Sequence, residues 1–156
     1  MATQNTNDQV LIISTIDTVP DLSQAITGTL STNGINVVGD GTTTKFTTEF
    51  NNGDWLFNGT NQVNRIDQIY SDNIMYLIAP FDVDLPIFTP AHRVPASRTQ
   101  QMGITANGTG ATVNGMALTS GQSINYGSDL DSDRTLNPMV LNGTAATLTV
   151  IKGLQG

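Results

Sequence analysis

Hydrophobic residues along this chain occur in short apolar runs and in alternation with polar residues. Residues 10–13 form an apolar run that suits a buried strand, and Phe46, Thr48 and Phe50 alternate with their neighbours. Alternation with a period of two is typical of strands that bury one face. The same reading predicts further strands at residues 35–38, 45–50, 54–57, 62–71, 73–81, 111–113, 116–118, 123–126, 139–141 and 146–151.

Asparagine–glycine pairs separate many of these predicted strands. Six of the fifteen glycines directly follow an asparagine, at positions 33–34, 52–53, 58–59, 107–108, 114–115 and 142–143. Both residue types tolerate the positive φ of a two-residue hairpin turn. The chain is therefore expected to be an all-β protein built from short antiparallel strands.

One stretch favours a short helix instead. Thr18 is a capping residue, Pro20 follows early, and Leu22 and Ile26 are four positions apart. One or two helical turns are expected over residues 18–26.

The positions of the predicted turns and of the prolines along the chain predict two small antiparallel β modules, each barrel- or sandwich-like. We expect an N-terminal segment at residues 1–28, a first β module at 29–81 and a second β module at 103–156. Between the modules, residues 82–102 form a proline-rich arm whose prolines remove the amide donors that a central strand needs.

The arm is the strongest candidate for an interaction site. Its apolar residues alternate with basic ones on a stiff, extended backbone, which indicates docking either on its own domain or on a neighbouring subunit. The residues expected at such a contact are Leu85, Ile87, Phe88, His92 and Arg93.

The composition of the chain restricts the classes of partner that it can bind. Charged residues make up 12% of the chain, and thirteen acidic against six basic side chains give a formal net charge of −7. That charge repels a phosphate backbone, so no nucleic-acid partner is expected. No run approaches the eighteen apolar residues of a membrane span, residues 1–8 lack the features of a signal peptide, and the chain has no cysteine. We expect no membrane association and no disulfides.

Candidate chemistry is sparse. Asp129, Asp131 and Asp133 offer hard oxygen ligands for calcium, but a solvated acidic loop is the simpler explanation and the sequence does not match an EF-hand. Asp82 and Asp84 would point to the same side of an extended strand, but two carboxylates alone are few for a metal. The only histidine, His92, has no glycine-framed serine nearby to activate. We therefore expect no enzyme activity and no cofactor.

Two stretches resemble modules of structural proteins from the virions of tailed bacteriophages. Residues 39–56 read as a glycine–threonine turn, a Phe-Thr pair and a Gly-Asp pair before an apolar strand, and residues 63–69 and 71–77 continue the pattern. Residues 113–124 and 139–144 are similar to small sandwich modules of phage heads, tails and fibres.

The resemblance implies a virion component, most plausibly a capsid decoration (cement) protein. Such a protein is made in the host cytoplasm, lies on the capsid surface, forms a homo-oligomer, with a trimer expected by analogy, and binds the major capsid protein. The alternative is a receptor- or carbohydrate-binding module of a tail fibre or baseplate, with Trp55 or Tyr126 stacking on sugars. A third class, a small hydrolase, would depend on the three aspartates at 129–133.

Overall fold

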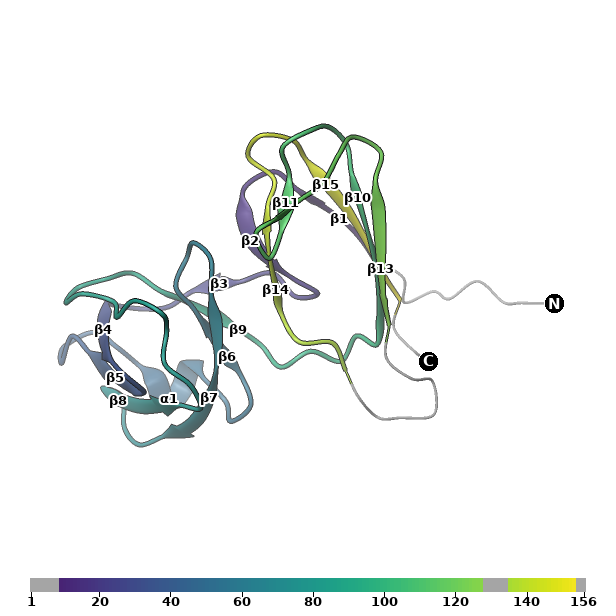
Figure 1. Ribbon diagram of the computed structural model, residues 1–156. Helices are drawn as coiled ribbons and strands as arrows, with labels where there is room; N and C mark the ends of the chain where they lie inside the picture. The colour runs from purple at the N-terminus through teal and green to yellow at the C-terminus, as the bar shows by residue number, and fades with distance from the viewer. Residues whose placement is uncertain (1–8, 128–134, 154–156) are drawn as a thin grey trace. The chain divides into compact units, whose positions relative to one another are not determined.

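The computed structural model describes residues 9–127 and 135–153 and confirms an all-β fold. Fifteen strands and one short helix are present in these residues, in the order shown in Figure 1. The chain divides into two compact units, which are called here the sandwich unit (residues 9–20, 97–127 and 135–153) and the barrel unit (residues 21–96). The division falls after Pro20 and Ala96, whereas the sequence analysis placed boundaries after residues 28, 81 and 102.

The sandwich unit consists of two four-stranded antiparallel sheets (Figure 1). One sheet has the order β1-β15-β10-β13, formed by Gln9–Ile13, Leu148–Gly153, Gln101–Ala106 and Ser123–Gly127. The other has the order β12-β11-β14-β2, formed by Met116–Ala117, Thr112–Val113, Met139–Asn142 and Ile16–Val19.

The core of the sandwich unit comes from alternate positions of both sheets. Ile104 and Val150 lie opposite one another on β10 and β15, and both are fully buried. Val113 and Leu141 hold the matching positions on β11 and β14. Along β10 and β15, one side chain of every two thus lies in the interior.

The barrel unit contains a seven-stranded sheet in the order β3-β9-β6-β7-β8-β5-β4. Its strands are Gln24–Ala25, His92–Val94, Trp55–Phe57, Val63–Ile69, Ile74–Leu77, Asn36–Gly39 and Leu30–Asn33, in that order. A register shift between Ile66 and Gln68 marks an irregularity in the pairing of β7 with β8.

Hydrogen bonds close this sheet on itself. The two edge strands, β3 and β4, follow one another in the chain. Both pair with residues 82–96, the part of the expected arm that belongs to the barrel unit, which is called here the proline-rich segment. Residues Gln24 and Ala25 pair with Arg93 and His92, while the Leu30 amide donates to the Thr89 carbonyl oxygen at 3.0 Å. The segment also pairs with β6 through β9, so it forms one side of a barrel.

Prolines flank β9 instead of interrupting it. Pro90 precedes and Pro95 follows the three residues that pair with β6 on one side and β3 on the other. No proline therefore lies within this central strand, as expected from the amide donor that proline lacks. A short central strand can still form between two prolines.

Two predicted elements were wrong. Residues 45–50 contain a helix, α1 (Phe46–Glu49), and not a strand. Phe46 and Phe50 lie on the same side of this single turn, with ring centroids 5.9 Å apart, and both are buried in the barrel core. Phe46, Thr48 and Phe50 follow one another at intervals of two residues, which suggested a strand. Phe46 and Phe50 are also four residues apart, and that spacing places two side chains on the same face of a helix.

Residues 18–26 were expected to contain helical turns, and they form parts of two strands. Val19 pairs with Met139 at the end of β2, and Gln24 and Ala25 form β3. Pairing with strands more than sixty residues away in the chain outweighs the local helix signals, which are weak by comparison.

Candidate functional site

An exposed apolar tip projects from the proline-rich segment of the barrel unit. Ile87 is 72% exposed and Phe88 is 69% exposed. The chain is fastened on both sides of them: the Leu85 amide donates to the Thr32 hydroxyl at 2.7 Å, and the Thr89 amide donates to the Leu30 carbonyl at 2.9 Å. These two residues, called here the Ile87–Phe88 tip, are thus held out by a well-anchored backbone.

The backbone of Phe88 is strained. Its φ is +65°, in the left-handed region that aromatic side chains rarely adopt. Such strain persists only where the surrounding structure enforces it, and it is concentrated at functional sites. Here the enforcing contacts are the backbone pairing of Thr89 with Leu30 and the Thr89 hydroxyl, which donates to the Pro86 carbonyl at 2.6 Å.

A shallow pocket of about 210 Å³ lies beside the tip. It is lined by the tip residues and by residues of β4 and β5, including Ser31 and the half-exposed Val38. A second side chain could insert between the tip and these strands. The pocket adds apolar contact surface to the two tip residues.

Asp40 forms the charged rim of this pocket, and its carboxylate is already saturated with donors. It accepts hydrogen bonds from the Thr43 hydroxyl and from the backbone amides of Thr42, Thr43 and Thr29. The Thr43 hydroxyl bond and these amide bonds hold the pKa of Asp40 well below its usual range. Asp40 therefore fixes the loop after β5 and stays charged.

The other three residues expected at the contact have side chains that contact the barrel unit itself. Leu85 is half-buried and packs against the barrel core. His92 belongs to β9, and its ring lies 5.8 Å from that of Phe57. Arg93 donates from Nε to the Asp54 carboxylate at 2.7 Å.

Asp54 fastens the end of the proline-rich segment. Its side chain is 3% exposed, and it accepts hydrogen bonds from Arg93 and from the backbone amides of Asn51, at 2.8 Å, and Ala96, at 3.2 Å. The Arg93 Nη1 atom also donates to the Gln24 side chain at 3.1 Å. This ion pair therefore holds the barrel unit together, because the contacts of Asp54 and Arg93 described here all join parts of that unit.

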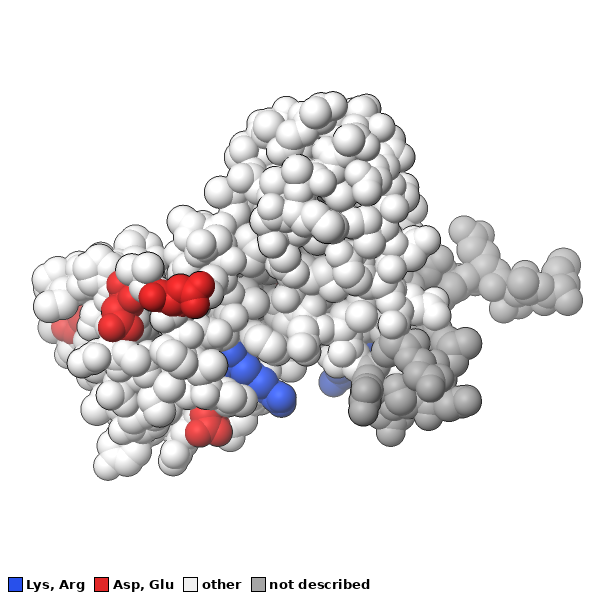
Figure 2. All heavy atoms as spheres, in the orientation of Figure 1, with Lys and Arg blue, Asp and Glu red and all other residues white. Residues whose placement is uncertain are grey.

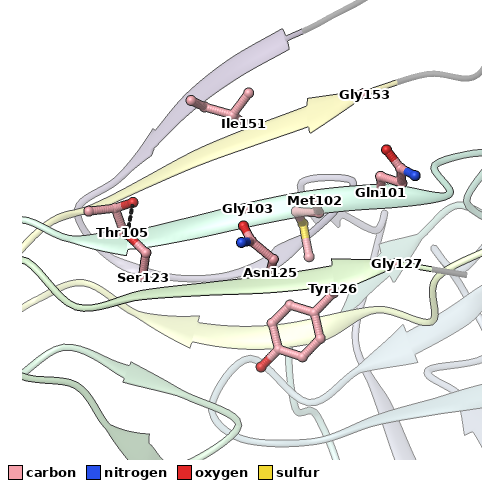
Figure 3. A pocket seen from close by; sticks show the side chains of 10 residues that line it. All are labelled: Gln101, Met102, Gly103, Thr105, Ser123, Asn125, Tyr126, Gly127, Ile151 and Gly153. Carbon is pink, nitrogen blue, oxygen red and sulfur yellow. Dashed lines mark hydrogen bonds between the residues drawn. The ribbon is translucent and has the colours of Figure 1, made fainter.

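A second hollow lies on the sandwich unit. It has a volume of about 580 Å³ and crosses the outer face of β10, β13 and β15. Figure 3 shows its lining residues, among which are three glycines: Gly103 within β10, and Gly127 and Gly153 at the ends of β13 and β15. The side chains of Gln101 and Asn125 flank this hollow, which is called here the glycine trough (Figure 3).

Several candidates from the sequence do not come together as sites. Asp84 accepts from the Gly34 amide at 2.9 Å and so holds the β4–β5 hairpin, whereas the Asp82 amide donates to the Gln62 side chain at 2.9 Å. Asp129, Asp131 and Asp133 lie outside the described residues. Within residues 9–127 and 135–153, no group of three or more histidine, aspartate or glutamate side chains is placed to hold a metal ion.

The aromatic residues considered for sugar stacking are partly withdrawn from the surface. Tyr126 packs against the core of the sandwich unit, and Trp55 is half-buried in β6.

The glycine trough was missed by the sequence analysis. The alternating pattern of residues 101–106, in which Met102, Ile104 and Ala106 are buried, is the signal that marks β10 and its bare outer face. These residues fell at the junction of the expected arm and second module.

Comparisons with known proteins identify no relative: no protein family, no curated protein and no solved structure matches this chain. No helix in the described part of the chain has the length and apolar character needed to span a lipid bilayer.

Proposed function

We propose that this chain is a non-enzymatic structural protein of a tailed-phage virion that binds the capsid surface as a decoration or cement protein. The observation that carries this proposal is the Ile87–Phe88 tip, because two large apolar side chains are held in water by an anchored and strained backbone. Exposing two large apolar side chains does not stabilise the fold, so we expect these side chains to bind a partner.

The contact chemistry of the tip suits a protein surface. Hydrophobic and aromatic side chains that enter a partner's pocket carry most of the binding free energy at protein interfaces. Val38 extends the apolar surface, and the ionised Asp40 at the rim offers a partner one fixed negative charge. A coat subunit with an apolar hollow bordered by a basic side chain fits this pattern.

The scaffold is suited to a repeated, static role. The barrel unit and the sandwich unit each have their own buried hydrophobic core. Each contact made by one tip is small. Many copies on one particle would multiply such weak contacts into stable binding and so stabilise the shell.

Two measurements test this function. First, quantitative mass spectrometry of purified particles from the source of the gene should find the chain in hundreds of copies per particle, whereas a dozen or fewer would place it in the tail or neck. Second, purified chain should sediment with particles stripped of it. The Phe88→Asn variant should lose at least tenfold in affinity, since truncating an aromatic hot spot costs about 2 kcal/mol or more and each step of about 1.4 kcal/mol is a factor of ten.

The control variant is Val83→Asn, which alters a side chain that is 77% exposed on the same segment. Wild-type affinity in the control and weak binding in Phe88→Asn would support the tip as the docking site. Absence from particles, or equal binding by both variants, would contradict the proposal. Selective binding of the isolated chain on a glycan array would favour the alternative function, a carbohydrate-binding module.

A further inference from the structure

The outer face of the sheet β1-β15-β10-β13 carries no charge at any described outward position. The register joins Val10, Ile151, Gly103 and Asn125 in one row across the four strands. Positions two residues away along each strand share this face, and none of them is charged either. This surface, which includes the glycine trough, is called here the trough face.

The trough face is divided into an apolar half and a polar half. Val10, Ile12 and Ile151, on β1 and β15, are 63%, 60% and 52% exposed. On β10 and β13 the outward groups are amides and hydroxyls. Apolar side chains exposed together on one half of a sheet indicate a surface that is covered in the assembled state.

The polar half contains groups that can pair with copies of themselves. Gln101 and Asn125 make no side-chain hydrogen bond within the described residues, and each amide offers both donors and acceptors. Asn125 lies over the bare glycine, since a methyl group at Gly103 would lie 3.0 Å from its amide oxygen. A carboxylate or an ammonium group could not pair with its own copy in this way.

Charge restricts where two copies of the chain can meet. The whole chain has a formal charge of −7, and the barrel unit alone contains eight acidic and three basic side chains. In the view of Figure 2 the acidic side chains in red lie over the barrel unit. Like charges repel across most contacts between two copies, whereas the trough face can be covered without burying any described carboxylate.

We infer that the trough face is the contact between two copies of this chain, related by a two-fold axis that runs across the strands. Such an axis lays each strand over the same strand of the partner in the opposite direction. The apolar half then meets the apolar half, and the amides meet amides. Two sheets that stack in this way lie about 10 Å apart.

This inference specifies the self-association within the proposed function and rests on that proposal only for its biological setting. A two-fold contact yields a dimer, whereas the resemblance to phage proteins implies a trimer. The molecular mass in solution therefore decides between them.

The first test is light scattering or sedimentation velocity on the purified chain over a hundredfold range of concentration. The wild type should show twice the monomer mass, and the double variant Ile12→Lys, Ile151→Lys should show the monomer mass. The control variant Ile78→Lys adds one such charge at a side chain that is 58% exposed on the barrel unit, and it should remain a dimer. A monomeric or trimeric wild type would overturn the inference.

The second test does not depend on lysine substitutions being tolerated. Because the chain contains no cysteine, a single introduced thiol can be cross-linked only to another copy. A short bismaleimide spans the gap between stacked sheets, which is too wide for a disulfide, so it should give a covalent dimer with Ile151→Cys and none with Ile78→Cys. Equal cross-linking of both variants would overturn the inference. Loss of particle binding with the dimer intact would contradict the proposed function alone, and a monomer that still binds particles would contradict the pairing alone.

Discussion

Replacing Asp54 with alanine tests whether the proline-rich segment is a fixed side of the barrel. The substitution removes the acceptor of three hydrogen bonds, two of which come from the end of that segment, at Arg93 and Ala96. The third comes from the amide of Asn51 in the turn before β6. All three donors would lose their partner at a site where the Asp54 side chain is 3% exposed.

The magnitude follows from burial. Breaking a buried ion pair by removing one partner costs about 3–5 kcal/mol, because the remaining charge is left without compensation. Arg93 is 21% exposed and keeps part of its hydration, so the lower end of that range applies. We expect the free energy of unfolding of the barrel unit to fall by about 3 kcal/mol.

Trp55 provides the assay. It is the only tryptophan of the chain and lies next to Asp54 in β6, so its fluorescence during urea titration reports the barrel unit. Asp67→Ala is the control, since Asp67 is an exposed aspartate on β7 of the same unit. Its effect should stay within about 0.5 kcal/mol.

A loss below 1 kcal/mol in Asp54→Ala, or a loss equal to that of the control, would refute the reasoning. It would mean that the segment is held by other contacts or is free to leave the barrel.

Three further predictions concern backbone strain, pH and packing. Phe88→Asn should raise the free energy of unfolding of the barrel unit by about 0.5–1 kcal/mol, because asparagine tolerates the φ of +65° better than phenylalanine does, and a decrease in urea titration would contradict the strain. The lowered pKa of Asp40 stabilises the fold above the unfolded-state value of about 3.9, and this contribution is lost as pH falls through the lower folded-state value. The thermal midpoint of Asp40→Asn should therefore fall less steeply below about pH 4 than that of the wild type, and parallel curves would contradict this cause. Gly143→Ala should destabilise the sandwich unit by about 2 kcal/mol or more in calorimetry, because the added methyl would lie 2.2 Å from the Ile13 carbonyl oxygen, whereas Gly127→Ala meets only an ordinary contact and should change little.

Local turn chemistry made the all-β class predictable from the sequence. At Asn33–Gly34 and Asn114–Gly115 the glycine has a positive φ, and each pair connects two adjacent antiparallel strands. Turn preferences act between neighbouring residues, so they can be read without knowing the rest of the fold. The alternation of buried and exposed positions within strands is local in the same sense.

Contacts between residues distant in sequence determine the parts of the fold that local sequence signals do not predict. Helix α1 is held at its start by Asp72, which accepts from the Thr47 amide at 3.1 Å although it lies 25 residues away. The Thr47 hydroxyl also donates to Asp72, and this bond lowers the pKa of that carboxyl. A single sequence does not reveal such a cap, because the pair shares no spacing rule.

The candidate site shows the same division. Ile87 and Phe88 were expected from sequence at a contact surface, and they are the residues of that group that the structure leaves exposed. Leu85, His92 and Arg93 share the same composition pattern but face their own barrel unit. The exposure of each residue depends on the pairing of the segment with β4 and β6, which composition does not encode.

Hydrogen exchange of the chain free and bound to particles tests the central claim, docking through the Ile87–Phe88 tip, most directly. In the free chain the amides of Ile87 and Phe88 have no hydrogen-bond partner in the described residues, so they should exchange rapidly, while the Thr89 amide is protected by Leu30. On particles, the exchange at Ile87 and Phe88 should slow at least tenfold. Unchanged exchange at these two amides, with new protection elsewhere on the bound chain, would contradict the account.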